Sequence, residues 1–165
     1  IIRVQPVYDE IESDYNRFFR IKKGELWGWV DASRQAVVES QFEEIGWQFE
    51  NGRIQVKKNN LWGWADRGGT VVVSPDFHSI EYINEDSISI VNKNDSWFLI
   101  DAKGDKISDE YDAIQYLSNK FYKGLKDTTW TLFNIYNFVL DPPTFQEIGY
   151  NFNYNLLWVK KNNLW

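Results

Sequence analysis

Neighbouring carboxylates are the residues of this sequence whose type and spacing could most directly support catalysis. Acidic pairs occur at Glu43-Glu44, Glu85-Asp86 and Asp109-Glu110. A glycoside hydrolase uses two carboxyl groups that flank the scissile bond at a defined separation in a cleft. The sequence shows no such separation, and the three pairs lie in or near expected turns. We therefore predict that the chain is not an enzyme.

The single histidine, His78, is the one candidate base for a serine nucleophile. It stands where equivalent segments of the chain carry Asp, Glu or Gln, which favours a solvent-facing variant of a repeated structural position. A zinc site needs several ligands, commonly Cys or His, and the chain has one His and no Cys. The sequence therefore predicts no catalytic residue, no metal site and no cofactor.

Three aspartates recur at expected turns, at Asp31, Asp66 and Asp101. They raise the question of calcium, but each turn offers few oxygen ligands, whereas Ca²⁺ takes about six to eight. Capping of the turn by the Asp side chain is the favoured interpretation. Asn94-Asp95-Ser96 fits a glycosylation sequon, but a match at a hairpin turn arises easily by chance.

The recurring tryptophans form the first of two aromatic series. They stand 33 or 35 residues apart, at Trp27, Trp62, Trp97, Trp130 and Trp165. A residue that every unit requires is most simply a core residue. We therefore predict that this series is structural.

The second aromatic series follows a marker tetrapeptide, which reads YDEI from Tyr8, FEEI from Phe42, FHSI from Phe77, YDAI from Tyr111 and FQEI from Phe145. Two places after the marker Ile stand Trp47, Tyr82, Tyr116 and Tyr150, with Phe49, Phe152 and Tyr154 close by. Such a ladder could stack on sugars or anchor a protein partner. Alternatively, these rings close the core at the edge of each unit.

Both series have one period of about 34 residues, which indicates a tandem repeat. The heptapeptide VKKNNLW occurs identically at 56–62 and 159–165. We predict a single repeat array over residues 1–165. Its units span about 8–41, 42–76, 77–110, 111–144 and 145–165, and the last unit is incomplete. We expect the protein to continue beyond it.

One unit reads as a three-stranded antiparallel meander. In the second unit, GRIQVKK at 52–58 and LWGWAD at 61–66 alternate in the manner of strands. Asn59-Asn60 between them suits a tight hairpin turn. The turn at 66–69 leads to a third strand, TVVVSP, and a short link through the marker, which could hold one helical turn.

A single meander is too small to bury its apolar faces, so the units must stack. The predicted fold class is all-β, with three-stranded repeats stacked as an open β-solenoid-like array. A closed propeller-like ring is the alternative. Propeller blades of four strands usually need about forty residues or more, which favours the open array.

The chain resembles the bacterial WG-repeat family. The resemblance rests on the marker, the Gly-led strand, the hairpin ending in Trp-Gly, the acidic turn and the Val-rich strand ending in Pro. Trp27-Gly28 and Trp62-Gly63 match closely, whereas Phe98 and Thr131 replace the Gly in the third and fourth units. The family forms arrays within larger proteins, and the resemblance implies no enzymatic activity.

Composition narrows the range of partners. A net charge of -6 argues against nucleic acid, which requires a basic surface. No apolar run approaches the roughly eighteen residues that span a bilayer. The sequence favours an interaction scaffold that binds a protein or other domains of a larger bacterial chain. The alternative is a glycan-binding module of a surface or envelope protein, which would place it at the cell envelope.

Overall fold

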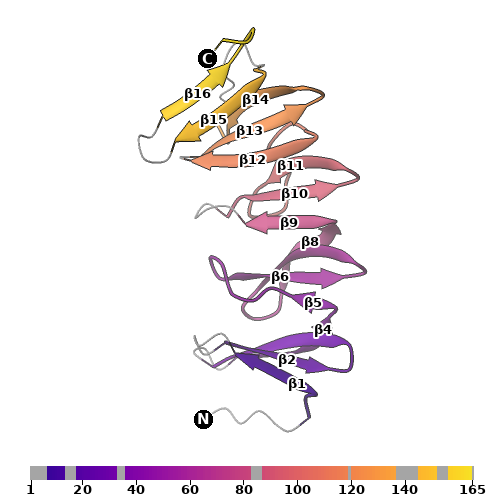
Figure 1. Cartoon of the computed structure of the whole chain (residues 1–165). Coiled ribbons are helices and arrows are strands. Elements are labelled where there is room, and N and C mark those ends of the chain that lie inside the picture. The colour runs from indigo at the N-terminus through magenta and orange to yellow at the C-terminus, as the bar shows by residue number, and fades with distance from the viewer. Residues whose placement is uncertain are drawn as a thin grey trace.

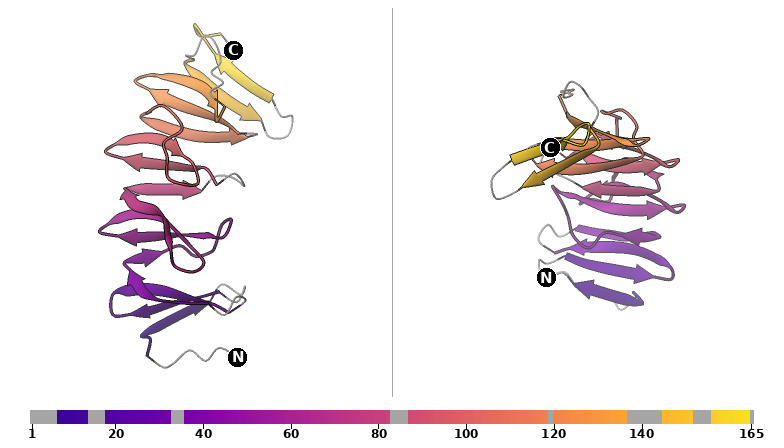
Figure 2. Two further views of the ribbon diagram at one scale, coloured as in Figure 1. Left: turned by 180° about the vertical axis from the view of Figure 1, so that it is seen from behind. Right: turned by 45° about the horizontal axis from the view of Figure 1, so that its top comes forward.

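The computed structural model describes residues 7–13, 18–32, 36–82, 87–118, 120–136, 145–151 and 156–164. Within these ranges the chain forms strands and turns without a helix, in five small antiparallel sheets. The sheets follow one another along an elongated column, with β1 and β16 at opposite ends (Figure 1). Figure 2 shows the same order of sheets from behind and with the top tilted forward. The described residues form no closed barrel, so the predicted open all-β array is confirmed.

The five sheets contain sixteen strands in chain order. The first sheet consists of β1 (Glu10–Ser13), β2 (Phe18–Lys23), β3 (Leu26–Asp31) and β4 (Ala36–Phe42). The second consists of β5 (Glu44–Ile45), β6 (Arg53–Lys58), β7 (Leu61–Asp66) and β8 (Val71–Phe77). The others consist of β9 (Ser79–Tyr82), β10 (Ser89–Lys93) and β11 (Ser96–Ile100); β12 (Ala113–Ser118), β13 (Phe121–Lys126) and β14 (Thr129–Asn134); and β15 (Glu147–Asn151) and β16 (Leu156–Lys160).

The segment around the marker differs from its expected form as a link with a helical turn. In four of the five units a strand begins within the marker and continues past it, and it pairs with the hairpin that follows. In the second unit the strand, β5, ends with the marker at Ile45. Ala113–Ser118, for example, runs antiparallel to Phe121–Lys126. The extra strand raises the number of strands to four in each of the first two sheets.

Glycine after the recurring tryptophan allows the last strand of a sheet to approach closely. A Cβ on Gly63 would lie 2.3 Å from the carbonyl oxygen of Val73, and one on Gly28 would lie 2.2 Å from that of Val38. The strand pairing is irregular at both places. In the third sheet Phe98 replaces the glycine, and only isolated bridges remain where the fourth strand would run.

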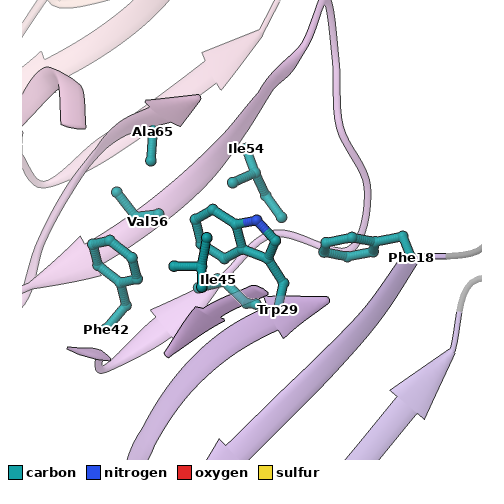
Figure 3. Packing of buried hydrophobic residues seen from close by; sticks show 8 residues of the cluster. Phe18, Trp29, Phe42, Ile45, Ile54, Val56 and Ala65 are labelled. Atoms are coloured by element: carbon teal, nitrogen blue, oxygen red, sulfur yellow. The ribbon is translucent and has the colours of Figure 1, made fainter. Parts of the chain in front are cut away.

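The core lies between consecutive sheets and not within one. In Figure 3, Phe18, Trp29 and Phe42 of the first sheet face Ile45, Ile54, Val56 and Ala65 of the second. The rings of Trp29 and Phe42 stack with centroids 5.7 Å apart. Three further clusters occur along the column. Each sheet therefore depends on its neighbour to bury its apolar face.

The two sequence markers of the repeat are neighbours in the structure. Each recurring tryptophan in the described residues pairs through its backbone with the aromatic residue of the next marker. The pairs are Trp27 with Phe42, Trp62 with Phe77, Trp97 with Tyr111 and Trp130 with Phe145. The Trp strand of one unit is thus joined to the residues that lead into the next sheet.

We expect Gly63→Ala to lower the free energy of unfolding by about 1–3 kcal/mol, because the added methyl overlaps the backbone of β8. Urea denaturation of the two proteins measures this difference. Gly46→Ala is the matched control, since its Cβ would meet neighbours no closer than 3.4 Å. Equal destabilisation by both substitutions would contradict the close-approach explanation.

The buried Tyr111 makes the stability of the fold depend on pH in the alkaline range. Burial raises the pKa of Tyr111 to about 12, and the Asp109 carboxylate adds to the increase. An unfolded tyrosine ionises near pH ~10, so this contribution to stability is fully present below about pH 10 and is lost as the pH rises towards 12. We expect Tyr111→Phe to lose less stability than the wild type between those pH values in denaturant titrations. Tyr136→Phe, at an exposed position, should retain the wild-type profile.

Candidate functional site

The second residue of the marker caps the hairpin turn of its own sheet. The carboxylate of Glu43 accepts hydrogen bonds from the backbone N–H of Asn59 at 2.8 Å and of Asn60 at 2.9 Å. Both turn residues have positive φ, 53° and 62°, so their N–H groups point to one side. Equivalent bonds run from Gly24 to Asp9 at 2.7 Å, from Asp127 to Asp112 at 2.7 Å, and from Asn163 to Gln146 at 2.8 Å.

His78 occupies this capping position in the third sheet. Its side chain is exposed. The turn beside it, Asn94-Asp95, also has positive φ, at 51° and 62°. Among the described residues, no side chain accepts a hydrogen bond from the two N–H groups of this turn. His78 is therefore the variant of a structural position that lacks the usual cap.

The acidic pairs that suggested catalysis have structural partners. Glu43 caps its turn, and Glu44 forms an ion pair with Lys57 at 3.5 Å. Glu110 pairs with Lys106 at 2.7 Å. Asp109 lines an open hollow of about 470 Å³ with Lys106, Ile107 and Ser108, and no second carboxylate is among these lining residues. Glu85-Asp86 lies outside the described residues.

The recurring turn aspartates also bind their own chain. Asp66 Oδ1 accepts from the N–H groups of Gly68 and Thr70, each at 2.9 Å. Asp101 Oδ1 does the same for Lys103 and Asp105, at 2.8 and 3.0 Å. Asp31 is buried and pairs across the unit boundary with Arg67 at 2.7 Å. Nowhere in the described ranges does a group of three or more His, Cys, Asp or Glu side chains suit a metal ion.

The recurring tryptophans lie at the margin of the core. The side chains of Trp27, Trp62, Trp97 and Trp130 are partly buried and pack against the four clusters. Trp165 lies outside the described residues. The residues two places later are the more deeply buried ones, with exposed fractions of 0% for Trp29, 2% for Trp64, 0% for Leu99 and 4% for Leu132. Alternation within LWGWVD and LWGWAD, which places Trp29 and Trp64 on the strand face of the recurring Trp, was the available signal for these two residues.

The second aromatic series does not form one exposed row among the described side chains. Trp47 is 69% exposed. Phe49 packs edge-on against Phe18 at 4.9 Å, and Tyr116 is partly buried with its ring 5.3 Å from that of Tyr122. The backbones of Tyr82 and Tyr150 belong to β9 and β15, but their side chains lie outside the description, as do Phe152 and Tyr154 entirely.

Arg20 connects Trp47 to the core. Its guanidinium carbon lies 4.0 Å from the centroid of the Trp47 ring and 4.4 Å from that of Trp27, so the cation is stacked between two indoles. Arg20 also forms an ion pair with Glu12 at 2.7 Å. The sequence analysis missed Arg20, although alternation in FFRIKK places it on the same strand face as Phe18.

Burial governs the electrostatics of this arginine. Arg20 is only 6% exposed. Burial lowers the pKa of its guanidinium, while the carboxylates of Glu12, Glu44 and Glu10 oppose the change. The arrangement holds a compensated cation in a fixed place, with one face of the Trp47 indole resting on it.

Comparisons with known proteins support the repeat organisation. The model of the family described as "WG containing repeat" matches residues 2–27, 27–62, 62–97 and 137–165. The search of curated proteins gave no match.

Several solved structures are similar over much of the chain. A Kluyveromyces lactis Hsv2p structure has 11% identity and a TM-score of 0.48, covering 96% of this chain and 73% of that one. A second K. lactis structure, of Hsv2 with complete loop 6CD, has 7% identity and a TM-score of 0.46. It covers 89% of this chain and 54% of that one. A Bacteroides caccae protein of unknown function has 12% identity and a TM-score of 0.36. Its structure covers 79% of this chain and 59% of that one. Such low identities and TM-scores carry no argument about function.

The uncapped turn in the third sheet generates a stability prediction. We expect His78→Asp to raise the free energy of unfolding by about 0.5–1.5 kcal/mol, because the new carboxylate can accept from the 94–95 turn as Asp112 does from Asp127. Thermal or urea unfolding measures the change.

His78→Ala is the control for simply removing the imidazole. If the alanine variant gained as much stability as the aspartate variant, capping would not be the cause.

Proposed function

This chain belongs to the family of WG-containing repeats, and we propose that it is a non-catalytic scaffold for protein–protein interaction within a larger bacterial protein or assembly. The observation that supports this most directly is how the repeated polar side chains are used. Glu43 and Asp112 cap turns, Asp66 and Asp101 close loops, and Asp31 pairs across a unit boundary. Side chains that hold the column together are not available for chemistry on a substrate.

The shape of the column suits such a role. Sheets stacked face to face present a long lateral surface (Figure 1), and repeat arrays use surfaces of this kind for recognition. A protein partner, or another domain of the same larger chain, matches this geometry. The charge of -6 disfavours nucleic acid as the partner.

No helix that could span a membrane occurs in the described parts of the chain.

Glycan binding at a bacterial surface or envelope is the alternative function. Its support is the exposed indole of Trp47, since aromatic faces stack on sugars. A protein partner is preferred because Phe49 and Tyr116 pack against neighbouring rings. Among the described side chains of the second series, one exposed ring remains, which is less than an extended sugar chain would use.

A capture experiment tests the scaffold function. The immobilised chain is exposed to soluble and envelope extracts of the source cell, each untreated, treated with protease or treated with glycosidase. We expect saturable capture that protease abolishes. Capture that survives protease but not glycosidase would support the glycan alternative, and capture of nothing would overturn both.

A further inference from the structure

At the junction of the first two sheets, the exposed indole of Trp47 rests on the guanidinium group of Arg20. Arg20 comes from β2, Trp27 from β3, and Trp47 from the segment after β5. The guanidinium covers the inner face of Trp47 at 4.0 Å, yet the residue remains 69% exposed. The outer face of this indole is therefore directed to solvent.

We propose that this outer face binds the guanidinium group of an arginine on a basic protein partner. The inference rests on the proposed scaffold function and adds the chemistry of the partner. An arginine placed there would extend the stack of Trp27, Arg20 and Trp47 by one further layer. Cations prefer the faces of indoles above those of other aromatic side chains.

The chain itself shows that its indole faces attract cations. Lys22 lies 5.3 Å from the Trp27 centroid, Lys57 lies 5.3 Å from that of Trp62, and Lys123 lies 4.5 Å from that of Trp130. In the described part of the chain, Arg20 is the one cation recorded against Trp47, and it occupies the inner face. The outer face is the position that a partner's cation can fill.

Charge complementarity favours a basic partner over a neutral one. The chain carries a net charge of -6, which attracts cationic proteins over long distances. Locally, the positive charge of Arg20 is compensated by its ion pair with Glu12 at 2.7 Å, and Glu10 and Glu44 act on it as well. A second guanidinium on the far side of Trp47 therefore meets little net repulsion.

The contact with Arg20 also holds the Trp47 side chain in place before a partner binds. Arg20 is 6% exposed and stacked between two rings, so the indole of Trp47 rests on an ordered group. A side chain held in place loses less conformational entropy on association. Tryptophans in such positions commonly dominate the affinity of protein interfaces.

Nuclear magnetic resonance on the isotope-labelled chain tests the proposal. The probe is a synthetic nonapeptide of alternating arginine and glycine, compared with the same peptide carrying uncharged citrulline in place of arginine. We expect the arginine peptide to shift the indole N–H signal of Trp47 saturably, with citrulline binding about five- to tenfold weaker.

Variants locate the interaction. Trp47→Ala should weaken binding of the arginine peptide about five- to tenfold, whereas Trp47→Phe, which keeps an aromatic face, should retain most of it. Tyr136→Ala is the matched control, because Tyr136 is 70% exposed and has Lys120 5.7 Å from its centroid. This control should bind as the wild type does.

Three results of the resonance experiment would overturn the inference. They are equal binding of the arginine and citrulline peptides, binding that leaves the Trp47 signal unmoved, and a Trp47 signal that responds to an oligosaccharide but not to arginine. Capture of the protease-sensitive partner by Trp47→Ala at the wild-type level would also overturn it, while leaving the scaffold function intact. Absence of any protease-sensitive capture by the wild type would instead remove the scaffold function.

Discussion

The backbone bridge between each recurring tryptophan and the next marker aromatic is the constraint on which the column depends. Tyr111 N–H donates to the carbonyl of Trp97 at 2.9 Å, and Trp97 N–H donates back at 2.8 Å. Phe145 and Trp130 exchange the same pair of bonds, each at 2.8 Å. The bridge ends one sheet and directs the chain into the next, so it sets where every later strand begins. Two segments about fifteen residues apart are thus connected by backbone hydrogen bonds, and this connection recurs along the array.

Three of the four marker residues have separate structural roles. Its aromatic residue forms the bridge, and its second residue caps the following hairpin except at His78. Its Ile enters the core between sheets, as Ile45 does at 2% exposure, whereas Ile11 of the first unit is 51% exposed. Stability is therefore a sum of contacts between neighbouring units. The backbone bridge is retained even where a unit departs from the repeat sequence. When Phe98 replaces glycine in the third sheet, the fourth strand is lost, but the Trp97–Tyr111 bridge remains.

These structural roles occupy several of the described acidic side chains. A carboxylate that accepts from two backbone N–H groups, as Glu43 does, or pairs with a buried guanidinium, as Glu12 does, is held in its orientation by its own chain. The boundary between the first two units has a cation stacked between two indoles. Arg20 places a cation between Trp27 and Trp47, whereas the equivalent Gln55 donates to the carbonyl of Ile80 at 2.7 Å and Lys123 to that of Ile148 at 2.9 Å. Of these three side chains, Gln55 and Lys123 bond to the backbone of the next unit, and Arg20 supports an exposed ring.

The sequence by itself determined the period, the hairpins and the turn caps. These features depend on residues close in the chain: alternation defines a strand, Asn59-Asn60 defines a turn, and Asp66 bonds to residues two and four places later. Only the tertiary structure decided that a strand begins within each marker, that Tyr116 packs against Tyr122 while Trp47 stays exposed, and that Arg20 lies between two indoles. The reason is that both rings occupy the same place in the repeat pattern. Their exposure is set by the neighbouring sheet that stacks on each unit, and a periodic sequence does not encode that difference locally.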